Sequence, residues 1–242
     1  MSQLQTNAVT EHTLRTTRIL PLIILSQFAC TTIWFAENAV MAHLQQDWHL
    51  PEGSLGYVTS AGQIGFIIGT LIFAVLAIAD RFSPRKVFFA CALAGGGASV
   101  GVALIPESSE GLLLLRFLTG FFLAGIYPVG LKIATGWFAK GLGRVFGYLV
   151  GALVLGTALP HLLRALGADL PWEYVIVSVS VLAIAGGAMM LLFVPDGPHL
   201  PAASPFNPGA LRAAFQVPGF RASAFGYFGH MWELYAFWAF AP

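Results

Sequence analysis

Long apolar runs without charge alternate with short polar segments along most of the sequence. Crossing the hydrocarbon core of a bilayer takes roughly 20 apolar residues in a helix, so each run predicts one transmembrane helix. The pattern predicts six such helices, at residues 19–36, 53–79, 87–106, 117–131, 145–163 and 174–195. The fourth run is short, but it continues through Arg116 and Lys132 to about Phe138. The expected fold class is therefore an all-α polytopic membrane protein.

The region after the sixth run differs in composition. Residues 196–220 are polar and contain Pro198, Pro201, Pro205, Pro208 and Gly209, which predicts a linker between two helical bundles. From residue 221 the sequence is apolar and aromatic again, and we expect a seventh transmembrane helix that is truncated at residue 242. The expected organisation is a tail at 1–17, a six-helix bundle at 18–195, a linker at 196–220 and the truncated helix at 221–242.

The composition excludes water as the main solvent of this chain. Hydrophobic residues make up 57% of its 242 residues, charged residues only 10%, and the mean hydropathy is +0.77. The net charge of +1 gives no reason to expect a nucleic-acid partner. Both cysteines, Cys30 and Cys91, lie in apolar runs, so we expect neither a disulfide nor a metal site. We find no phosphate-binding loop, paired metal-ligand histidines or nucleophile elbow, and therefore expect no enzyme.

Basic residues are distributed unequally between the two sides of the predicted bundle. With the amino terminus inside, only Arg164 lies in an outer loop, and nine basic residues lie in inner segments. These nine are Arg15, Arg18, Arg81, Arg85, Lys86, Lys140, Arg144, Arg212 and Arg221. The positive-inside rule therefore predicts a cytoplasmic amino terminus and cytoplasmic linker, with the bacterial inner membrane as the expected location.

The turn between the second and third runs carries the most specific motif. It reads ADRFSPRKV over residues 79–87 and supplies Asp80, Arg81, Arg85 and Lys86. In this turn the chain resembles the major facilitator superfamily, whose signature reads roughly G-x-x-x-D-R-x-G-R-K. It departs from that signature with Leu76 at the first glycine and with Ser83-Pro84 in place of the loop glycine. The resemblance implies a conformational gate that contacts a second half, and the alternative is an ordinary basic inner loop.

The resemblance also implies a fold and a substrate cavity. Members of the family pair two six-helix bundles, each built from two inverted three-helix repeats, around a cavity lined by spans one, four and seven. Arg116 with Gly120 resembles the R-x-x-x-G pattern of the family's fourth span. Glu37 and Arg116 each lie about five residues from the predicted outer end of their spans, or roughly 7 Å deep. We therefore expect a Glu37–Arg116 pair that faces a wet cavity; alternatively, Glu37 only marks the membrane edge beside Asn38.

Further cavity residues are predicted in the fourth and seventh spans. Pro128 predicts a kink beside Tyr127 that would free a carbonyl to line the cavity. Lys132, near the inner end of the fourth span, is expected to extend to the cytoplasmic face. In the seventh span, His230, Trp232 and Glu233 could form a proton relay or a substrate contact, or could belong to an interfacial aromatic belt.

Small residues at helix-packing spacing occur in the second and fifth spans. Such residues let helices approach closely. They are Ala61, Gly65 and Gly69 in the second span, and Gly147, Gly151 and Gly156 in the fifth, where Pro160 predicts a kink. The resemblance implies that these two spans face the opposite bundle.

The predicted function is secondary active transport of a small solute by alternating access. We expect the lipid bilayer, a small-molecule substrate and a carboxy-terminal six-helix half as partners, no cofactor, and coupling to a proton or another ion. Uptake of a small anion or organic acid and proton-coupled drug export both remain open. A non-transporting membrane module built on a transporter scaffold is the alternative from another class.

Overall fold

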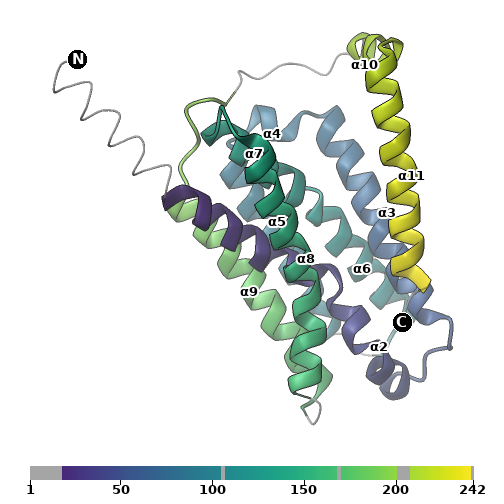
Figure 1. Ribbon diagram of the computed structural model, residues 1–242. Coiled ribbons are helices and arrows are strands. Elements are labelled where there is room, and N and C mark those ends of the chain that lie inside the picture. Colours follow the sequence, from purple (N-terminus) through teal and green to yellow (C-terminus); the bar gives the residue numbers. More distant parts are fainter. Residues whose placement is uncertain (1–17, 105–106, 168–169, 201–207, 241–242) are drawn as a thin grey trace, which may run out of the picture.

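The computed structural model describes residues 18–104, 107–167, 170–200 and 208–240 (Figure 1). Within these ranges the chain is helical and contains no β-strand. Helices pack side by side into one bundle, and α11 runs along its edge beside α3 (Figure 1). The all-α architecture predicted from the apolar runs is confirmed.

The first span is longer than predicted and is broken in its middle. A helix over residues 18–31 is followed by the short 3₁₀ helix η1 (Thr32–Trp34), a bend at Phe35 and α2 (Ala36–Asp47). The prediction of an end at residue 36 was wrong because α2 is polar, with the sequence AENAVMAHLQQD. A search for uncharged runs stops at Glu37, whereas that residue lies ten residues before the end of a 30-residue span.

The other spans lie within a few residues of their predicted positions. The second is α3 (Ser54–Val75), the third α5 (Pro84–Val102), the fifth α8 (Leu142–Leu166) and the sixth α9 (Trp172–Phe193). The fourth consists of α6 (Ser109–Leu123) and α7 (Tyr127–Trp137), with a break at residues 124–126 just before Pro128. The short helix α4 (Ile78–Arg81) lies in the turn after α3.

Helix ends follow local sequence signals. The Ser108 hydroxyl accepts a hydrogen bond from the Gly111 amide at the start of α6. Pro84 occupies the first turn of α5, where its missing N–H costs nothing. Gly141 precedes α8 with φ of 71°, a backbone conformation that glycine adopts without strain.

Five of the described helical segments are long and apolar enough to cross a membrane: residues 18–47, α3, residues 109–137, α8 and α9. The predicted third span, α5, is not among them. It begins with Arg85 and Lys86 and contains three consecutive glycines, and both features lower its mean hydropathy. It nevertheless packs inside the bundle against α6 and α9. Helix α11 (Pro218–Phe240), the predicted seventh span, is not among the five either.

The closest helix crossing joins α3 to α6 within this bundle. A Cβ at Gly65 would lie 2.1 Å from the Phe117 carbonyl oxygen, and one at Gly69 would lie 2.5 Å from the Phe121 carbonyl oxygen. Gly65 and Gly69 therefore pack against α6 of the same bundle. That the second and fifth spans face an opposite bundle stays a prediction. Ala61 is only half-buried, and its neighbour Gly62 faces α6 instead.

The glycines of α8 fall into two groups. Gly156 packs on the first span, since a Cβ there would lie 2.3 Å from the Thr31 hydroxyl oxygen and 2.6 Å from the Phe28 carbonyl oxygen. Gly147 and Gly151 are exposed, and no atom of the described residues lies within 4 Å of a Cβ built on either. Pro160 lies inside α8 and is buried. The predicted packing role of Gly147 and Gly151 therefore finds no partner within the part of the chain that the structure describes.

The start of the predicted linker is docked on the bundle. The His199 amide donates to the Gly136 carbonyl at 2.8 Å, and the Trp137 indole N–H donates to the Pro195 carbonyl at 2.8 Å. The predicted linker also contains the helix α10 (Pro208–Gln216). Residues 201–207 lie outside the described part of the chain.

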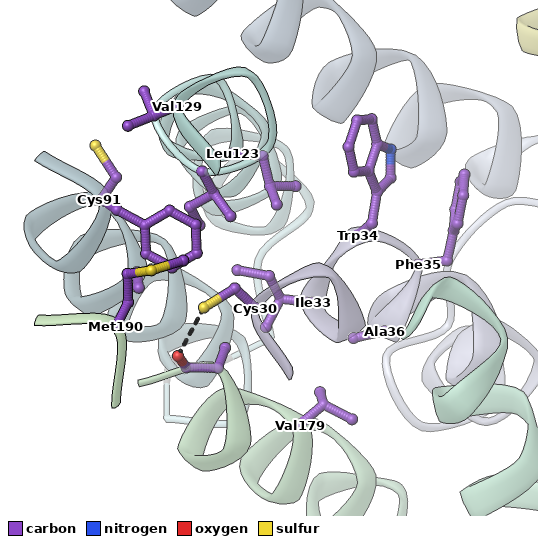
Figure 2. Packing of buried hydrophobic residues seen from close by; sticks show 14 of the residues in the cluster. Cys30, Ile33, Trp34, Phe35, Ala36, Cys91, Leu123, Val129, Val179 and Met190 are labelled. Carbon is purple, nitrogen blue, oxygen red and sulfur yellow. Dashed lines mark hydrogen bonds between the residues drawn. The ribbon is translucent and has the colours of Figure 1, made fainter. Parts of the chain in front are cut away.

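The core lies where the broken first and fourth spans meet α5 and α9. Figure 2 shows Ile33 and Cys30 of the first span beside Leu123 and Val129 of the fourth, with Met190 of α9. Cys30 is buried and its thiol donates to the Ala183 carbonyl at 3.1 Å. The two broken spans are therefore packed together in the interior, and this core positions the site.

Candidate functional site

Arg116 of α6 binds two backbone carbonyls at the break in the first span. Its Nη1 donates to the Ile33 carbonyl at 3.2 Å, and its Nη2 donates to the Trp34 carbonyl. Arg116 is only 2% exposed. The guanidinium, with its fixed fork of donors, thus links the fourth span to the backbone at the break in the first span.

Glu37, at the start of α2, balances this buried cation. Its Oε2 lies 2.8 Å from Arg116 Nη1, and its Oε1 accepts a hydrogen bond from the Ser99 hydroxyl of α5 at 3.2 Å. Glu37 is 0% exposed. Both carboxylate oxygens therefore have donors, which is the condition under which a buried charge is tolerated.

Gly62 of α3 supplies the space for the guanidinium. A Cβ at this position would lie 3.1 Å from Arg116 Nε and 3.2 Å from its Cζ. One turn beyond Arg116, a Cβ at Gly120 would lie 1.9 Å from the Gly62 carbonyl oxygen. The glycines of the α3–α6 crossing and the buried charge are therefore parts of one arrangement.

The predicted pair forms, but it lies deeper and is more enclosed than expected. Glu37 precedes Asp47, the end of α2, by ten residues, and Arg116 follows Ser109, the start of α6, by seven. At 1.5 Å per residue these positions are about 15 and 10 Å from the helix ends. Since neither side chain is exposed, the pair lies inside the bundle and not on the wall of a wet cavity. Direct substrate contact by this pair stays a prediction.

Among the remaining predicted cavity residues, Asn38 adjoins Glu37 in the chain, and the others lie on α7 and α11. The Asn38 amide donates to the Thr59 hydroxyl of α3 at 2.7 Å. Tyr127 is half-buried at the start of α7. His230 and Glu233 are exposed on α11, and Trp232 is 76% exposed. Helix α11 contacts α3, where the Gln63 amide reaches the Tyr235 carbonyl at 3.5 Å. The structure does not join these α11 side chains to Glu37 and Arg116.

A second charged region lies at the predicted cytoplasmic ends of the helices. Lys132 of α7 forms an ion pair with Asp80 of α4, in the turn after the second span. That Lys132 extends to the cytoplasmic face stays a prediction. The side chains of Asp80 and Lys132 are 36% and 20% exposed. A cavity of about 190 Å³ lies beside them, lined by Thr70, Phe73, Ala74, Ala79, Asp80, Ala124, Pro128, Val129 and Lys132.

Asp196 contacts the other end of the loop at residues 79–87. It accepts hydrogen bonds from the Ser83 hydroxyl at 2.7 and 3.0 Å and lies 3.8 Å from Arg85 Nε. Arg85 also donates to the Leu191 carbonyl at 3.3 Å. Arg81 and Lys86 are exposed. Asp80 and Arg85, predicted as gate residues, are therefore tied to the fourth and sixth spans of the same bundle.

Sequence reasoning missed three participants. Ser99 carries no signal because a serine in an apolar helix is common. Gly62 was overlooked in favour of Ala61, one position earlier. Asp196 could have been found, because an acid immediately after the sixth apolar run falls on the same side as the basic gate loop. Among the described residues, no three His, Cys, Asp or Glu side chains gather as metal ligands.

Comparison with known proteins gives a consistent family match. Residues 23–242 match the model of the Major Facilitator Superfamily. The niacin transporter NiaP of Acinetobacter baylyi is 32% identical over 50% of this chain and 29% of the relative. The quinolone resistance transporter of Acinetobacter baumannii is 30% identical over 64% of this chain and 37% of the relative. The 4-hydroxybenzoate transporter PcaK of Pseudomonas putida is 28% identical over 63% of this chain and 34% of the relative.

A solved structure gives the same fold. A bacterial homologue of the human lysosomal transporter Spinster, in an inward-facing and unoccupied conformation, matches with a TM-score of 0.66 at 16% identity. The match covers 84% of this chain and 48% of that protein. The aligned region spans about a third of each of the three relatives and about half of the solved structure.

Proposed function

Because the chain belongs to the major facilitator superfamily, a family of membrane transporters and not of enzymes, we propose that it is one half of a secondary transporter for small aromatic carboxylates. Its apolar helices make it an integral membrane protein. The observation that carries the proposal is the Glu37–Arg116 pair, buried at the break of the first span. A charge pair inside a membrane bundle is costly to keep, so its presence supports a role in the transport cycle.

The names of two relatives support the substrate class. Niacin and 4-hydroxybenzoate, named as the solutes of two relatives, are both small aromatic carboxylic acids. A basic side chain near the substrate path favours an anionic solute. Proton-coupled export of a drug is the second candidate, supported by the name of the quinolone resistance relative and by the aromatic character of α11.

The geometry suggests how the pair would couple to movement. While Glu37 is ionised, it holds Arg116 against the Ile33 and Trp34 carbonyls, and the first span stays bound to the fourth. A proton on Glu37 would remove the counter-charge, and an incoming carboxylate would compete for the guanidinium. Either event would loosen the contact between the first and fourth spans. The proposal therefore assigns both proton coupling and alternating access to Glu37 and Arg116.

A second six-helix bundle is part of the proposal. Apolar side chains such as Ile64, Leu71 and Val154 are exposed on α3 and α8, and Gly147 and Gly151 leave the surface of α8 open. Surfaces of this kind fit either lipid or a partner bundle. We place the amino terminus and the gate loop in the cytoplasm of a bacterium, with the bundle in its inner membrane. If the chain is instead a non-transporting module, adding a second bundle will give no transport.

The test is uptake of radiolabelled 4-hydroxybenzoate and niacin by vesicles that contain the chain together with a second bundle. Arg116→Gln should abolish uptake at every pH tested. Arg164→Gln, at the outer end of α8, is the matched control and should retain uptake. Export of a quinolone with no uptake of either acid would favour the second candidate. Uptake that survives Arg116→Gln would contradict the proposed role of the pair.

A further inference from the structure

Gln27 is a fully buried polar residue that lacks hydrogen-bond partners. It lies in the helix 18–31 and is 0% exposed. Neither Nε2 nor Oε1 of its carboxamide has a hydrogen-bond partner among the described residues. An unpaired amide in the interior of a membrane bundle makes the fold less stable than an apolar side chain of the same shape would.

The fourth span is shaped to admit this carboxamide. A Cβ at Gly130 of α7 would lie 2.0 Å from Gln27 Oε1 and 3.5 Å from Cε2 of the buried Phe88 ring. Any side chain at position 130 would therefore displace the amide. The carboxamide lies between the first and fourth spans, close to the break at residues 124–126.

The two threonines one turn further along the first span have hydrogen-bond partners within the bundle, whereas the buried hydroxyl of Ser26, next to Gln27, has none among the described residues. The Thr31 hydroxyl donates to the Gln27 carbonyl at 2.9 Å, and the Thr32 hydroxyl donates to the Ala29 carbonyl at 2.7 Å. A resident water would need two to four polar partners. Gly130 and the Phe88 ring lie on one side of the carboxamide and offer such a water no polar side chain. The unpaired amide is therefore better explained by a ligand that binds in another state of the cycle.

We infer that the Gln27 carboxamide is a contact for the transported solute, reached when the first and fourth spans move apart at their breaks. The solute class rests on the proposed function: Nε2 would donate to a carboxylate or hydroxyl oxygen of an aromatic acid, and Oε1 would accept from a hydroxyl. Gly130 provides the space for this contact. The fold tolerates an unpaired amide here because the solute pairs it.

The first test measures thermal unfolding of the chain in detergent and needs no substrate. Gln27→Leu removes the unpaired amide at nearly constant volume and should raise the unfolding midpoint by about 3 °C. Thr32→Val is the matched control on the same span. It removes a hydroxyl that is already hydrogen-bonded and should lower the midpoint. A fall in the midpoint for Gln27→Leu would mean that the amide has a structural partner, which would overturn the inference.

The second test measures uptake of labelled 4-hydroxybenzoate and niacin by the chain supplied with its second bundle. Gln27→Leu should raise KM about tenfold with little change in maximal rate, because a solute contact is lost. Gln27→Asn keeps a carboxamide and should recover part of the affinity. An unchanged KM for Gln27→Leu would contradict the inference even if the variant is more stable.

A third measurement separates this inference from the proposed function. Gln27→Cys should react with N-ethylmaleimide in the same vesicles, because the position must open during the cycle. The unsubstituted chain, whose Cys30 and Cys91 are buried, is the control. Labelling without uptake of either acid would refute the proposed substrate class, but it would still support the claim that position 27 opens during the cycle. No labelling would overturn the inference, whatever the substrate is.

Discussion

The interior of this bundle and its edge at the loop of residues 79–87 both carry ion pairs, but the two regions enclose them to different degrees. Glu37 and Arg116 are 0% and 2% exposed, whereas the four side chains of the Asp80–Lys132 and Arg85–Asp196 pairs are 20% to 38% exposed. Removing one partner of a buried pair leaves an uncompensated charge, while water and salt replace the partner of an exposed one. The interior pair therefore fixes the first span to the fourth, and the edge pairs can exchange partners at little cost.

The largest expected effect comes from removing half of the interior pair. Arg116→Leu leaves Glu37 buried without its counter-charge and removes the guanidinium that donates to the Ile33 and Trp34 carbonyls. We expect a loss of about 3–5 kcal/mol in the free energy of unfolding. Loss of the helical circular dichroism signal on heating in detergent measures it. Lys132→Leu is the control at the edge, and an equal loss for both variants would remove the distinction between the two regions.

The close crossing of α3 and α6, which holds the interior pair, should also be sensitive to small changes. Gly120→Ala places a Cβ 1.9 Å from the Gly62 carbonyl oxygen, and the overpacking should cost about 1–3 kcal/mol. Gly151→Ala in α8 meets no atom of the described residues within 4 Å and should be neutral or slightly stabilising. The same thermal assay compares the two alanine variants. Similar losses of stability would contradict the close packing of α3 against α6.

A milder substitution tests how tightly the guanidinium is enclosed. In Gly62→Ala the new Cβ lies 3.1 Å from Arg116 Nε, so the guanidinium must shift by a few tenths of an ångström. We expect a loss of about 1 kcal/mol relative to Gly56→Ala, which lies in the same helix with no atom within 4 Å. If the two alanine variants unfold at the same temperature, Arg116 has more room than the structure gives it.

The smallest effects are expected at the edge of the bundle, at the loop of residues 79–87. Asp80→Asn and Asp196→Asn should each change the free energy of unfolding by less than about 1 kcal/mol. Raising the salt concentration to about 1 M should reduce that change further, because exposed charges are screened. Unfolding at low and high salt measures both effects. A loss of several kcal/mol in the free energy of unfolding that does not depend on salt would mean that these pairs are as enclosed as the interior pair.

The spans of the bundle could be predicted from the sequence because hydrophobic length is a local property. The first span shows the limit of that reasoning, since the polar helix α2 lies inside the bundle through contacts with α8 and α9. No apolar run marks such a helix. Its buried Glu37 pairs with Arg116, which is distant in sequence.

Part of the site could also be predicted from local features of the sequence. Two opposite charges in apolar spans indicate a pair, so Glu37 and Arg116 could be matched. The difference between Gly65 and Gly147 could not be predicted, because both belong to the same glycine spacing and only the neighbouring helix distinguishes them. Ser99 and Gln27 are equally silent in sequence, since a single polar side chain does not reveal whether it has a partner.

A double-mutant cycle on Glu37→Gln and Arg116→Gln tests the central claim most directly, namely that this pair fastens the broken first span to the fourth. Measured by unfolding in detergent, the account predicts a coupling energy of about 2 kcal/mol or more, against less than about 0.5 kcal/mol for the matched cycle on Asp80→Asn and Lys132→Gln. A coupling energy at Glu37 and Arg116 no larger than that at the edge would contradict it.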